Sequence, residues 1–512
     1  MQFLFKILLV VALFIAWGVP PGLAWADVAS VPRSNTSIQP YLDQVIDRIS
    51  EFRLDNGMKF IVLKRDRAPV VSFMLYADAG GANEPDGVTG VAHYLEHLAF
   101  KGTKQIGTKD YQAEKPLMDE MDALFDQIKA AEAAGDEAKV GQLTSRFNQV
   151  QAEAATYVNQ NEFAKIVEQE GGIGMNATTS ADATRYFYSL PANKLELWMS
   201  LESERFLDPV FREFYKEKQV ILEERRLRTE NSPVGQMIEA LLDEAFQVHP
   251  YRRPVIGYTK DLKAMTRENV GDFFSAFYVP NNLTAVIVGD IDPTQVKQLA
   301  ETYFGRYPAQ SEPPKLTKVE PRQDKAREVT LELQSQPWYF ETYHRPEFNH
   351  PDHVVYQAIA NILSSGRTAR LYKSMVEEQQ IALAAEGLNS FPGNKYPTLM
   401  LFYALTAPGH TVDEVAAALD QEIQRLTTEL VSQEELDRVK TQARAGLLRS
   451  LSSNMGMASA LAEYQVKTGS WKNLFQELDA ISEITPADIQ RVAKATFRPE
   501  NRTIGKILPK ES

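Results

Sequence analysis

Runs of β-branched and aromatic residues, separated by turn residues, mark the start of the folded chain. Such residues flank an Asn-Gly pair in residues 51–63, which predicts a strand, a turn and a second strand. Residues 70–76 predict a further strand, and residues 80–87 predict a loop. Thr89 is expected to cap a short helix that Gly102 terminates. Strands and helix together indicate a mixed α and β fold.

Helical periodicity dominates the next segment. Residues 113–170 are rich in Ala, Glu, Gln, Lys and Leu at helical spacing, with a break near Gly135. This pattern predicts a long helical hairpin that faces solvent and carries no catalytic residue. Residues 171–190 are expected to form a loop and a strand, and residues 192–227 two helices.

The pattern of one segment recurs 219 residues further along the chain. Residues 265–290 align on residues 484–509 without a gap, and each copy reads as a helix, a Pro-x-Asn turn and a β-rich run. Between the copies, residues 306–322 are rich in Pro and charge, which is typical of a linker. The chain is therefore predicted to be α+β, with two related α/β half-domains at residues 51–305 and 323–512, each a mixed sheet flanked by helices.

The first residues carry an apolar run of another kind. Lys6 precedes eleven apolar residues, 7–17, and Ala24-Trp25-Ala26 has the small-x-small pattern of a signal-peptidase site. Eleven apolar residues fall short of the roughly 20 that span a bilayer. Residues 1–26 are therefore predicted to be a cleaved secretory signal rather than a membrane anchor, followed by a lead at residues 27–50. The mature protein is expected to be extracytoplasmic, periplasmic or secreted, without a membrane span.

Composition narrows the chemistry. With 55 Lys and Arg against 68 Asp and Glu, the net charge of -13 gives no electrostatic reason to expect a nucleic acid as partner. The 512 residues contain no Cys, which excludes disulfides, thiolate metal sites and Cys nucleophiles. Any metal must therefore bind through nitrogen and oxygen.

Two of the seven histidines lie four residues apart, in His93-Tyr94-Leu95-Glu96-His97. On a helix, such positions share one face about 6 Å apart, so that two imidazoles can bind one tetrahedral metal ion. Glu96 projects beside them, where a general base would take a proton from the water that the metal polarises. The alternative is a surface helix with two histidines of no function.

A hydrolytic zinc site also needs a third protein ligand and one open position. The best-placed candidates lie in a predicted helix, where Glu217 and Glu224 are two turns apart on one face. Spacing alone does not decide between Glu223 and Glu224. By itself, an acidic helix is more often a solvated surface.

The His-x-x-Glu-His order, followed by Leu-Ala-Phe-Lys-Gly-Thr at residues 98–103, resembles the inverzincins of the insulinase/pitrilysin family, which includes processing-peptidase subunits. The resemblance extends over the mature chain from about residue 51. Besides the histidine motif, it rests on Asp55-Asn56-Gly57, the loop from Ala79-Gly80-Gly81 to Gly90, Asn176-Ala177-Thr178 with Asp182 and Thr184, residues 217–224, His249-Pro250-Tyr251 and residues 278–282.

The resemblance implies a catalytic zinc-peptidase domain at residues 51–305 and an inactive peptidase-like domain at residues 323–512, closed on one another as a clam-shell. It implies a substrate bound as an added β-strand near Asn176, and a structural role for His249. It also implies a Zn²⁺ ion bound by His93, His97 and Glu224, with Glu96 as general base and Glu217 as an acidic residue that supports catalysis.

Two features depart from the family pattern. The 126 residues between His97 and Glu224 exceed the usual spacing, and the helical segment 113–170 accounts for the surplus. An Arg and a Tyr, seven residues apart, often help family members hold substrate, but Val376 and Leu383 align with them here. The resemblance therefore implies a homodimer, or a heterodimer with a homologous subunit that carries the Arg/Tyr clamp.

The second half has no His pair at i, i+4 spacing, and His350 and His353 are expected to be surface residues in a turn. The function that follows is a secreted, zinc-dependent endopeptidase that hydrolyses peptides or unfolded segments. The alternative is a non-catalytic scaffold or assembly subunit of the same family. Such subunits commonly lose metal ligands, whereas every expected ligand is present here.

Overall fold

The structure is a computed structural model that describes residues 39–510, so the predicted signal at residues 1–26 lies outside the described residues. The chain divides into two compact units, residues 1–48 and 49–512. The described part of the first unit contains helix α2 (Gln39–Asp47). Within residues 39–510, no helix combines the length and the apolar character that a membrane crossing requires.

The first sheet of the second unit has six strands in the order β1-β2-β6-β3-β5-β4. β2 runs parallel to β6, and all other neighbours are antiparallel. Every residue of β6 is buried, as expected of a central strand that is covered on both faces, whereas β4 lies at an edge. The strands are β1 (Ile49–Arg53), β2 (Lys59–Lys64), β3 (Val70–Ala77), β4 (Ile173–Thr179), β5 (Thr184–Pro191) and β6 (Leu283–Gly289).

The second sheet has five strands in the order β7-β11-β8-β10-β9, and its only parallel pair is β7 with β11. Without β1, the first sheet has the same order and the same strand directions. The two sheets flanked by helices confirm the predicted fold class. The strands are β7 (Arg327–Leu333), β8 (Trp338–Arg345), β9 (Ala382–Phe391), β10 (Thr398–Thr406) and β11 (Arg502–Pro509).

The sequence repeat has a counterpart in side-chain contacts. Adding 219 to the bounds of α11 (Arg267–Phe277) gives those of α18 (Pro486–Thr496), and both helices begin with a capping box. After each helix an asparagine, Asn282 or Asn501, donates its side-chain N–H to the carbonyl oxygen five residues earlier, at 2.8 and 2.9 Å. The two segments therefore share one local structure.

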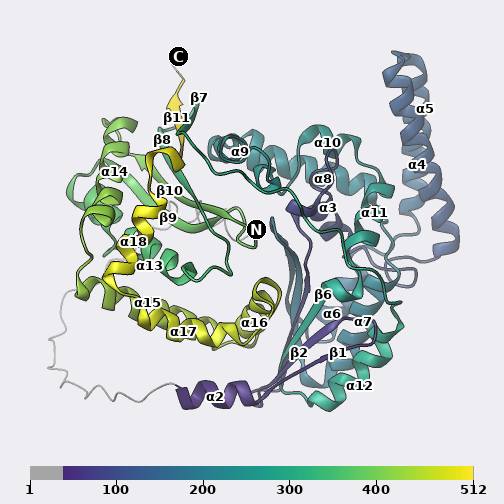
Figure 1. The fold of residues 1–512 in the computed structure, drawn as a ribbon. Helices are drawn as coiled ribbons and strands as arrows, with labels where there is room; N and C mark the ends of the chain where they lie inside the picture. The colour runs from purple at the N-terminus through teal and green to yellow at the C-terminus, as the bar shows by residue number, and fades with distance from the viewer. Residues whose placement is uncertain (1–38, 511–512) are drawn as a thin grey trace, which may run out of the picture. The chain divides into compact units, whose positions relative to one another are not determined.

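Each half contributes one helix to the sheet of the other. α9 (Pro233–Ala245) packs on β7 and β11, and α16 (Asn454–Thr468) packs on β3 and β6, as Figure 1 shows. Met237 and Leu241 of α9 belong to one apolar cluster with Phe340, Leu401 and Ile507 of the second sheet. Side chains of both halves thus share one apolar cluster around α9. The remaining α-helices are α3 (Val91–Leu98), α4 (Tyr111–Ala133), α5 (Glu137–Ala155), α6 (Glu162–Gln169), α7 (Leu195–Leu207), α8 (Phe214–Arg225), α10 (Thr259–Ala264), α12 (Pro293–Tyr303), α13 (His353–Ser364), α14 (Val412–Thr428), α15 (Gln433–Ser450) and α17 (Asn473–Glu483).

The helical segment predicted at residues 113–170 contains α4, α5 and α6. α4 and α5 form an antiparallel pair that extends away from the first sheet (Figure 1). Its outer turns are exposed, as expected, but its base is not. Asp122 of α4 accepts a hydrogen bond from the Tyr215 hydroxyl at 2.9 Å, and Phe147 of α5 contacts the Tyr215 ring at 5.0 Å between centroids. The base of the hairpin therefore supports α8.

Candidate metal centre

α3 begins one residue later than predicted, and a different residue binds its first amides. Its N-cap is Gly90, with φ of +89°, where an added Cβ would lie 2.6 Å from the Ile256 carbonyl oxygen. The buried Glu84 carboxylate accepts from the Gly90 and Ala92 amides at 2.8 and 3.0 Å. The prediction of Thr89 as the cap is wrong, because its hydroxyl donates to Asp261 at 2.6 Å. Thr89 is buried beside Asp261, so its hydroxyl binds this carboxylate rather than an amide of the helix.

The predicted end of α3 is also wrong. The helix ends at Leu98, with Ala99 as its C-cap, rather than at Gly102. Gly102 instead has φ of +96° in the following loop, where an added Cβ would meet the Ile106 carbonyl oxygen at 2.1 Å. The glycine is thus required by a tight loop and not by a helix end.

α3 and α8 lie against each other, which brings two distant parts of the sequence together. The Tyr94 ring of α3 stacks on Phe214 of α8 at 4.7 Å between centroids, and the Tyr94 hydroxyl donates to the Phe214 carbonyl. Glu217 and Glu224 of α8 both contact histidines of α3. Glu223 is half exposed and pairs with Arg226, so that the structure separates the two acidic neighbours.

Three of the predicted site residues converge. One donor atom from each of His93, His97 and Glu224 lies within 4.8 Å of the other two. The Nε2 atoms of His93 and His97 lie 3.8 and 3.5 Å from the Glu224 carboxylate oxygens. Zinc with ligands at about 2.0–2.1 Å needs tetrahedral donor atoms roughly 3.3 Å apart, so the donor atoms of this set would move closer together to bind one such ion. This is the one such group found among residues 39–510.

The proton positions on His97 suit a metal ligand. Its Nδ1 lies 2.8 Å from Oε1 of Glu217, which accepts from it, so in the neutral imidazole that binds a metal Nδ1 carries the proton and Nε2 presents a lone pair. The other oxygen of Glu217 lies 2.7 Å from Nζ of Lys101. Glu224 has a cation partner as well, since Nη1 of Arg228 contacts its Oε1.

Glu96 faces the end of an edge strand. Its Oε2 accepts a hydrogen bond from the Thr179 hydroxyl of β4 at 2.6 Å. That bond leaves Oε1 available to a water molecule or a substrate. Asn176 is exposed on the same strand, and its side chain accepts from the Ala177 amide at 2.9 Å.

Burial and nearby charges shift the pKa values of the predicted site residues. Burial lowers the pKa of His93 well below its usual value, so its imidazole is neutral at neutral pH. Burial alone would also lower the pKa of His97, but Glu217 and Glu224 raise it overall. Burial raises the pKa of Glu96, against the hydrogen bond from Thr179. For Glu217, burial opposes ionisation, yet the bonds from His97 and Lys101 keep its pKa below the usual range.

In the second half, the predicted position of one histidine is wrong. His353 was expected on the surface, but it is the first residue of α13 and only 8% exposed. Its Nδ1 lies 3.3 Å from Nη2 of Arg345. Val376 is half buried in a π-helical turn, and Leu383 is exposed in β9, so neither offers a charged or hydroxyl group.

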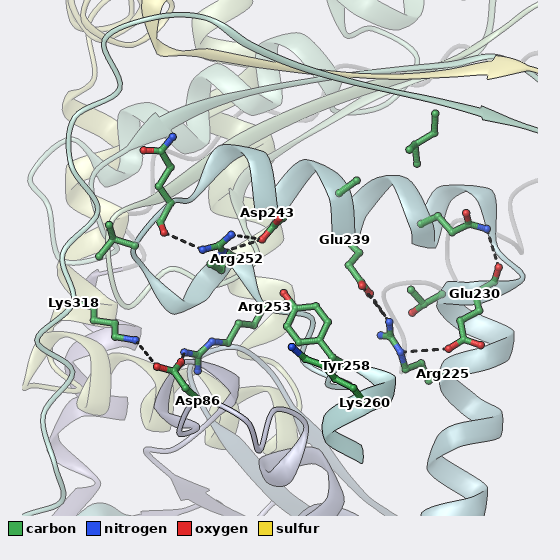
Figure 2. Close-up of a pocket in the computed structure, with 16 residues that line it drawn as sticks. Asp86, Arg225, Glu230, Glu239, Asp243, Arg252, Arg253, Tyr258, Lys260 and Lys318 are labelled. Carbon is green, nitrogen blue, oxygen red and sulfur yellow. Dashed lines mark hydrogen bonds and ion pairs between the residues drawn. The ribbon is translucent and has the colours of Figure 1, made fainter. Parts of the chain in front are cut away.

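A cavity of about 1050 Å³ lies at the end of α8 and along α9 (Figure 2). It has no histidine, and its charged residues are largely paired within the wall. Arg252 binds Asp243, Arg225 contacts Glu239 and Glu230, and both Arg253 and Lys318 contact Asp86 (Figure 2). The cavity is therefore separate from the histidine group in its chemistry.

The sequence prediction missed the residues that hold the site residues in place. Glu84, Lys101, Thr179 and Arg228 each contact a site residue or the helix that bears it. Lys101 lies within the motif at residues 98–103 and Arg228 lies four residues after Glu224, so both positions had a local signal. Glu84 and Thr179 had no such signal, because their contacts to α3 and to Glu96 form only in the folded chain.

Comparison with known protein families gives two matches along the chain. The family described as "Insulinase (Peptidase family M16)" matches residues 60–118 and 151–259, and "Peptidase M16 inactive domain" matches residues 264–443. The break at residues 119–150 falls within α4 and α5, which identifies this part of the hairpin as additional to the family pattern. The chain belongs to the insulinase family of peptidases, M16.

Similar proteins include named zinc proteases. The chain is 28% identical over 467 residues to the zinc protease PqqE of Helicobacter pylori, covering 89% of this chain and 92% of that protein. It is 26% identical to a probable mitochondrial-processing peptidase subunit beta of Schizosaccharomyces pombe, covering 86% and 87%. A crystal structure of a protease from Helicobacter pylori superposes with a TM-score of 0.76, 25% identity, and coverage of 90% and 99%.

Proposed function

We propose that this protein is a zinc-dependent endopeptidase that hydrolyses peptides or unfolded segments. The observation that carries the proposal is the convergence of His93, His97 and Glu224 from two helices that are distant in sequence. Its relatives named zinc proteases support the same activity. Zinc in this group would polarise a water molecule and the carbonyl of the scissile peptide bond.

Glu96 is proposed to move the proton. Its Oε2 is held by the Thr179 hydroxyl, so Oε1 takes a proton from the attacking water and returns it to the leaving amine. Glu217 orients His97 through the Nδ1 proton.

The edge strand β4 is proposed to bind the substrate. Thr179 at its end contacts Glu96, and an extended peptide added beside β4 would therefore run past the metal group. Asn176, exposed on β4, would contact that peptide. Main-chain pairing reads backbone more than side chains, which suits unfolded substrates.

Export and a partner complete the proposal. The predicted signal at residues 1–26 would send the mature chain to a periplasmic or secreted location, as in the structural neighbour titled periplasmic protease PqqL from Escherichia coli. Because Val376 and Leu383 occupy the positions of the Arg/Tyr pair, a homologous subunit would supply that clamp. Peptidase assays with and without such a subunit test this point: full activity of the purified chain alone contradicts it.

Replacing Glu96 with Gln tests the mechanism. Glu96→Gln keeps the shape of the side chain and should leave zinc bound, while peptide cleavage falls by roughly 10²–10⁴-fold because no base accepts the water proton. Zinc content by metal analysis and cleavage of a quenched fluorescent peptide are the measurements. Full cleavage by the zinc-loaded variant would refute the mechanism.

The ligand assignment has a matched control on the same helix. Glu224→Gln should lose most of the zinc, whereas Glu223→Gln should keep it, because Glu223 is half exposed and contacts Arg226 instead of the histidines. Tight zinc binding by both variants would contradict the site.

A further inference from the structure

Lys101 is the second partner of the carboxylate that orients His97. Its Nζ lies 2.7 Å from Oε2 of Glu217, while Oε1 of Glu217 lies 2.8 Å from Nδ1 of His97. The side chains of Lys101 and Glu217 are only 19% and 9% exposed. Both oxygens of this buried carboxylate are therefore engaged, one by the lysine and one by the histidine.

The lysine restricts the orientation of Glu217. A carboxylate with one partner can rotate and offer that partner either oxygen. With an ammonium group on Oε2, rotation would break a poorly screened charge contact, so Oε1 stays on His97. No other Lys or Arg pairs with Glu217 within residues 39–510.

The backbone of Lys101 is itself fixed. The carbonyl oxygen of Lys101 accepts from Nη1 of Arg212 at 2.6 Å, and Nη2 of Arg212 donates to the Thr103 carbonyl at 2.6 Å. Arg212 is 1% exposed and also binds Glu114 of α4 at 3.1 Å. The loop after α3 is thus anchored at the base of the helical hairpin, which sets where the Lys101 side chain starts.

The other acidic neighbour of Lys101 does not depend on it. Glu213 lies 3.7 Å from Nζ of Lys101, but it contacts Nζ of Lys216 at 2.6 Å and the Gln160 side chain at 2.9 Å. Glu217, by contrast, has Lys101 as its one Lys or Arg partner within residues 39–510.

We propose that Lys101 is a positioning residue for the metal group: it holds Glu217 so that the Nδ1 proton of His97 stays bound and Nε2 of His97 stays directed at the metal. The inference rests on the proposed zinc function. It assigns to a residue of the loop after α3 a role that acts through Glu217 and not through contact with the metal or the substrate.

Metal affinity tests the role without any need for activity. Lys101→Met in the full mature chain should weaken Zn²⁺ binding by roughly tenfold, measured by competition with a chromophoric chelator, because support of this kind is worth about 10–100-fold. Co²⁺ bound to the same variant should show an altered d–d absorption spectrum. Lys101→Arg should recover most of the affinity, since a guanidinium group also binds a carboxylate.

A lysine of the same loop provides the control. Lys104 lies 2.7 Å from Asp208 and is 48% exposed, so Lys104→Met removes one positive charge nearby without contact to Glu217. Its Zn²⁺ affinity should equal that of the wild type. Urea unfolding of the metal-free variants verifies that each is folded, and Lys101→Gln replaces Lys101→Met if the latter is not.

A double-mutant cycle separates this role from a general loss of structure. In a Glu217→Gln background, Lys101→Met should cause no further loss of Zn²⁺ affinity, because the lysine acts through Glu217. An equal loss in both backgrounds would overturn the inference, as would wild-type affinity and spectrum in Lys101→Met. A wild-type chain that binds no Zn²⁺ would instead contradict the proposed function itself.

Discussion

At the scale of single residues, the metal group depends on partners that each fix one atom. Glu217 accepts a hydrogen bond from Nδ1 of His97, and Lys101 contacts the other oxygen of Glu217. Thr179 donates a hydrogen bond to one oxygen of Glu96. The contacts to His97 and Glu96 leave Nε2 of His97 and Oε1 of Glu96 free for a metal ion, a water molecule or a substrate. The spacing of His93, Glu96 and His97 predicts that their side chains lie together on one helix, whereas these partners come from other segments.

The buried histidine of the second half predicts a pH effect on stability. Burial, together with the nearby Arg345, lowers the pKa of His353 to about 3 from its usual 6.5. Between these values the unfolded chain binds a proton that the folded protein does not, so stability falls as pH drops from about 6.5 towards 3. His353→Gln should reduce the stability lost between pH 7 and pH 5 by about 2 kcal/mol.

Urea unfolding of wild type and variant at the two pH values measures this difference. His410→Gln is the control, because the His410 side chain is 34% exposed in the same half. An identical pH dependence for wild type and His353→Gln would show that His353 is not held neutral by the fold.

At the scale of elements, the helical hairpin has two parts with different roles. Its sequence predicted two helices with little apolar surface, and the outer turns of α4 and α5 fit that description. At the base, Glu114 and Arg212 form an ion pair in which both residues are 1% exposed. Sequence pattern did not reveal this, because a Glu at the start of a helix also suits the helix dipole.

Removal of one partner of the buried pair should be costly. Arg212→Met leaves Glu114 buried without its cation and should lower the free energy of unfolding by about 3–5 kcal/mol. Arg146→Met breaks an exposed pair with Glu120 between α5 and α4 and should cost about 0–1 kcal/mol. Urea denaturation measures both variants. Equal effects would mean that the hairpin base is not part of the folded core of the first half.

At the scale of the whole molecule, the two halves are joined by more than the linker. α9 of the first half covers β7 and β11, and α16 of the second half covers β3 and β6. Contacts between the halves also include Lys395 with Asp78 at 2.5 Å. Each half alone would expose an apolar sheet face and an apolar helix face to water.

A cut in the linker should therefore leave the halves associated. A specific protease site inserted between Ser311 and Glu312, both exposed and outside helices and strands, allows cleavage of the folded protein. The two fragments should elute together on size exclusion in buffer and separate in urea. Separation in buffer alone would contradict the exchange of helices. Uncleaved protein that carries the same insertion is the control.

Several features of this protein could be predicted from spacing and periodicity along the sequence. The His93 and His97 pair, the acidic face of α8 and the 219-residue repeat all follow from spacing along one segment, since a helix or strand imposes its period directly on the sequence. Tertiary structure decided the rest. It placed Glu224 beside the histidines and Glu223 against Arg226, gave α3 its anchor at Glu84 and packed α9 and α16 on the opposite sheets. An amphipathic pattern states that a face is buried but not against what, because hydrophobic burial has no direction of its own.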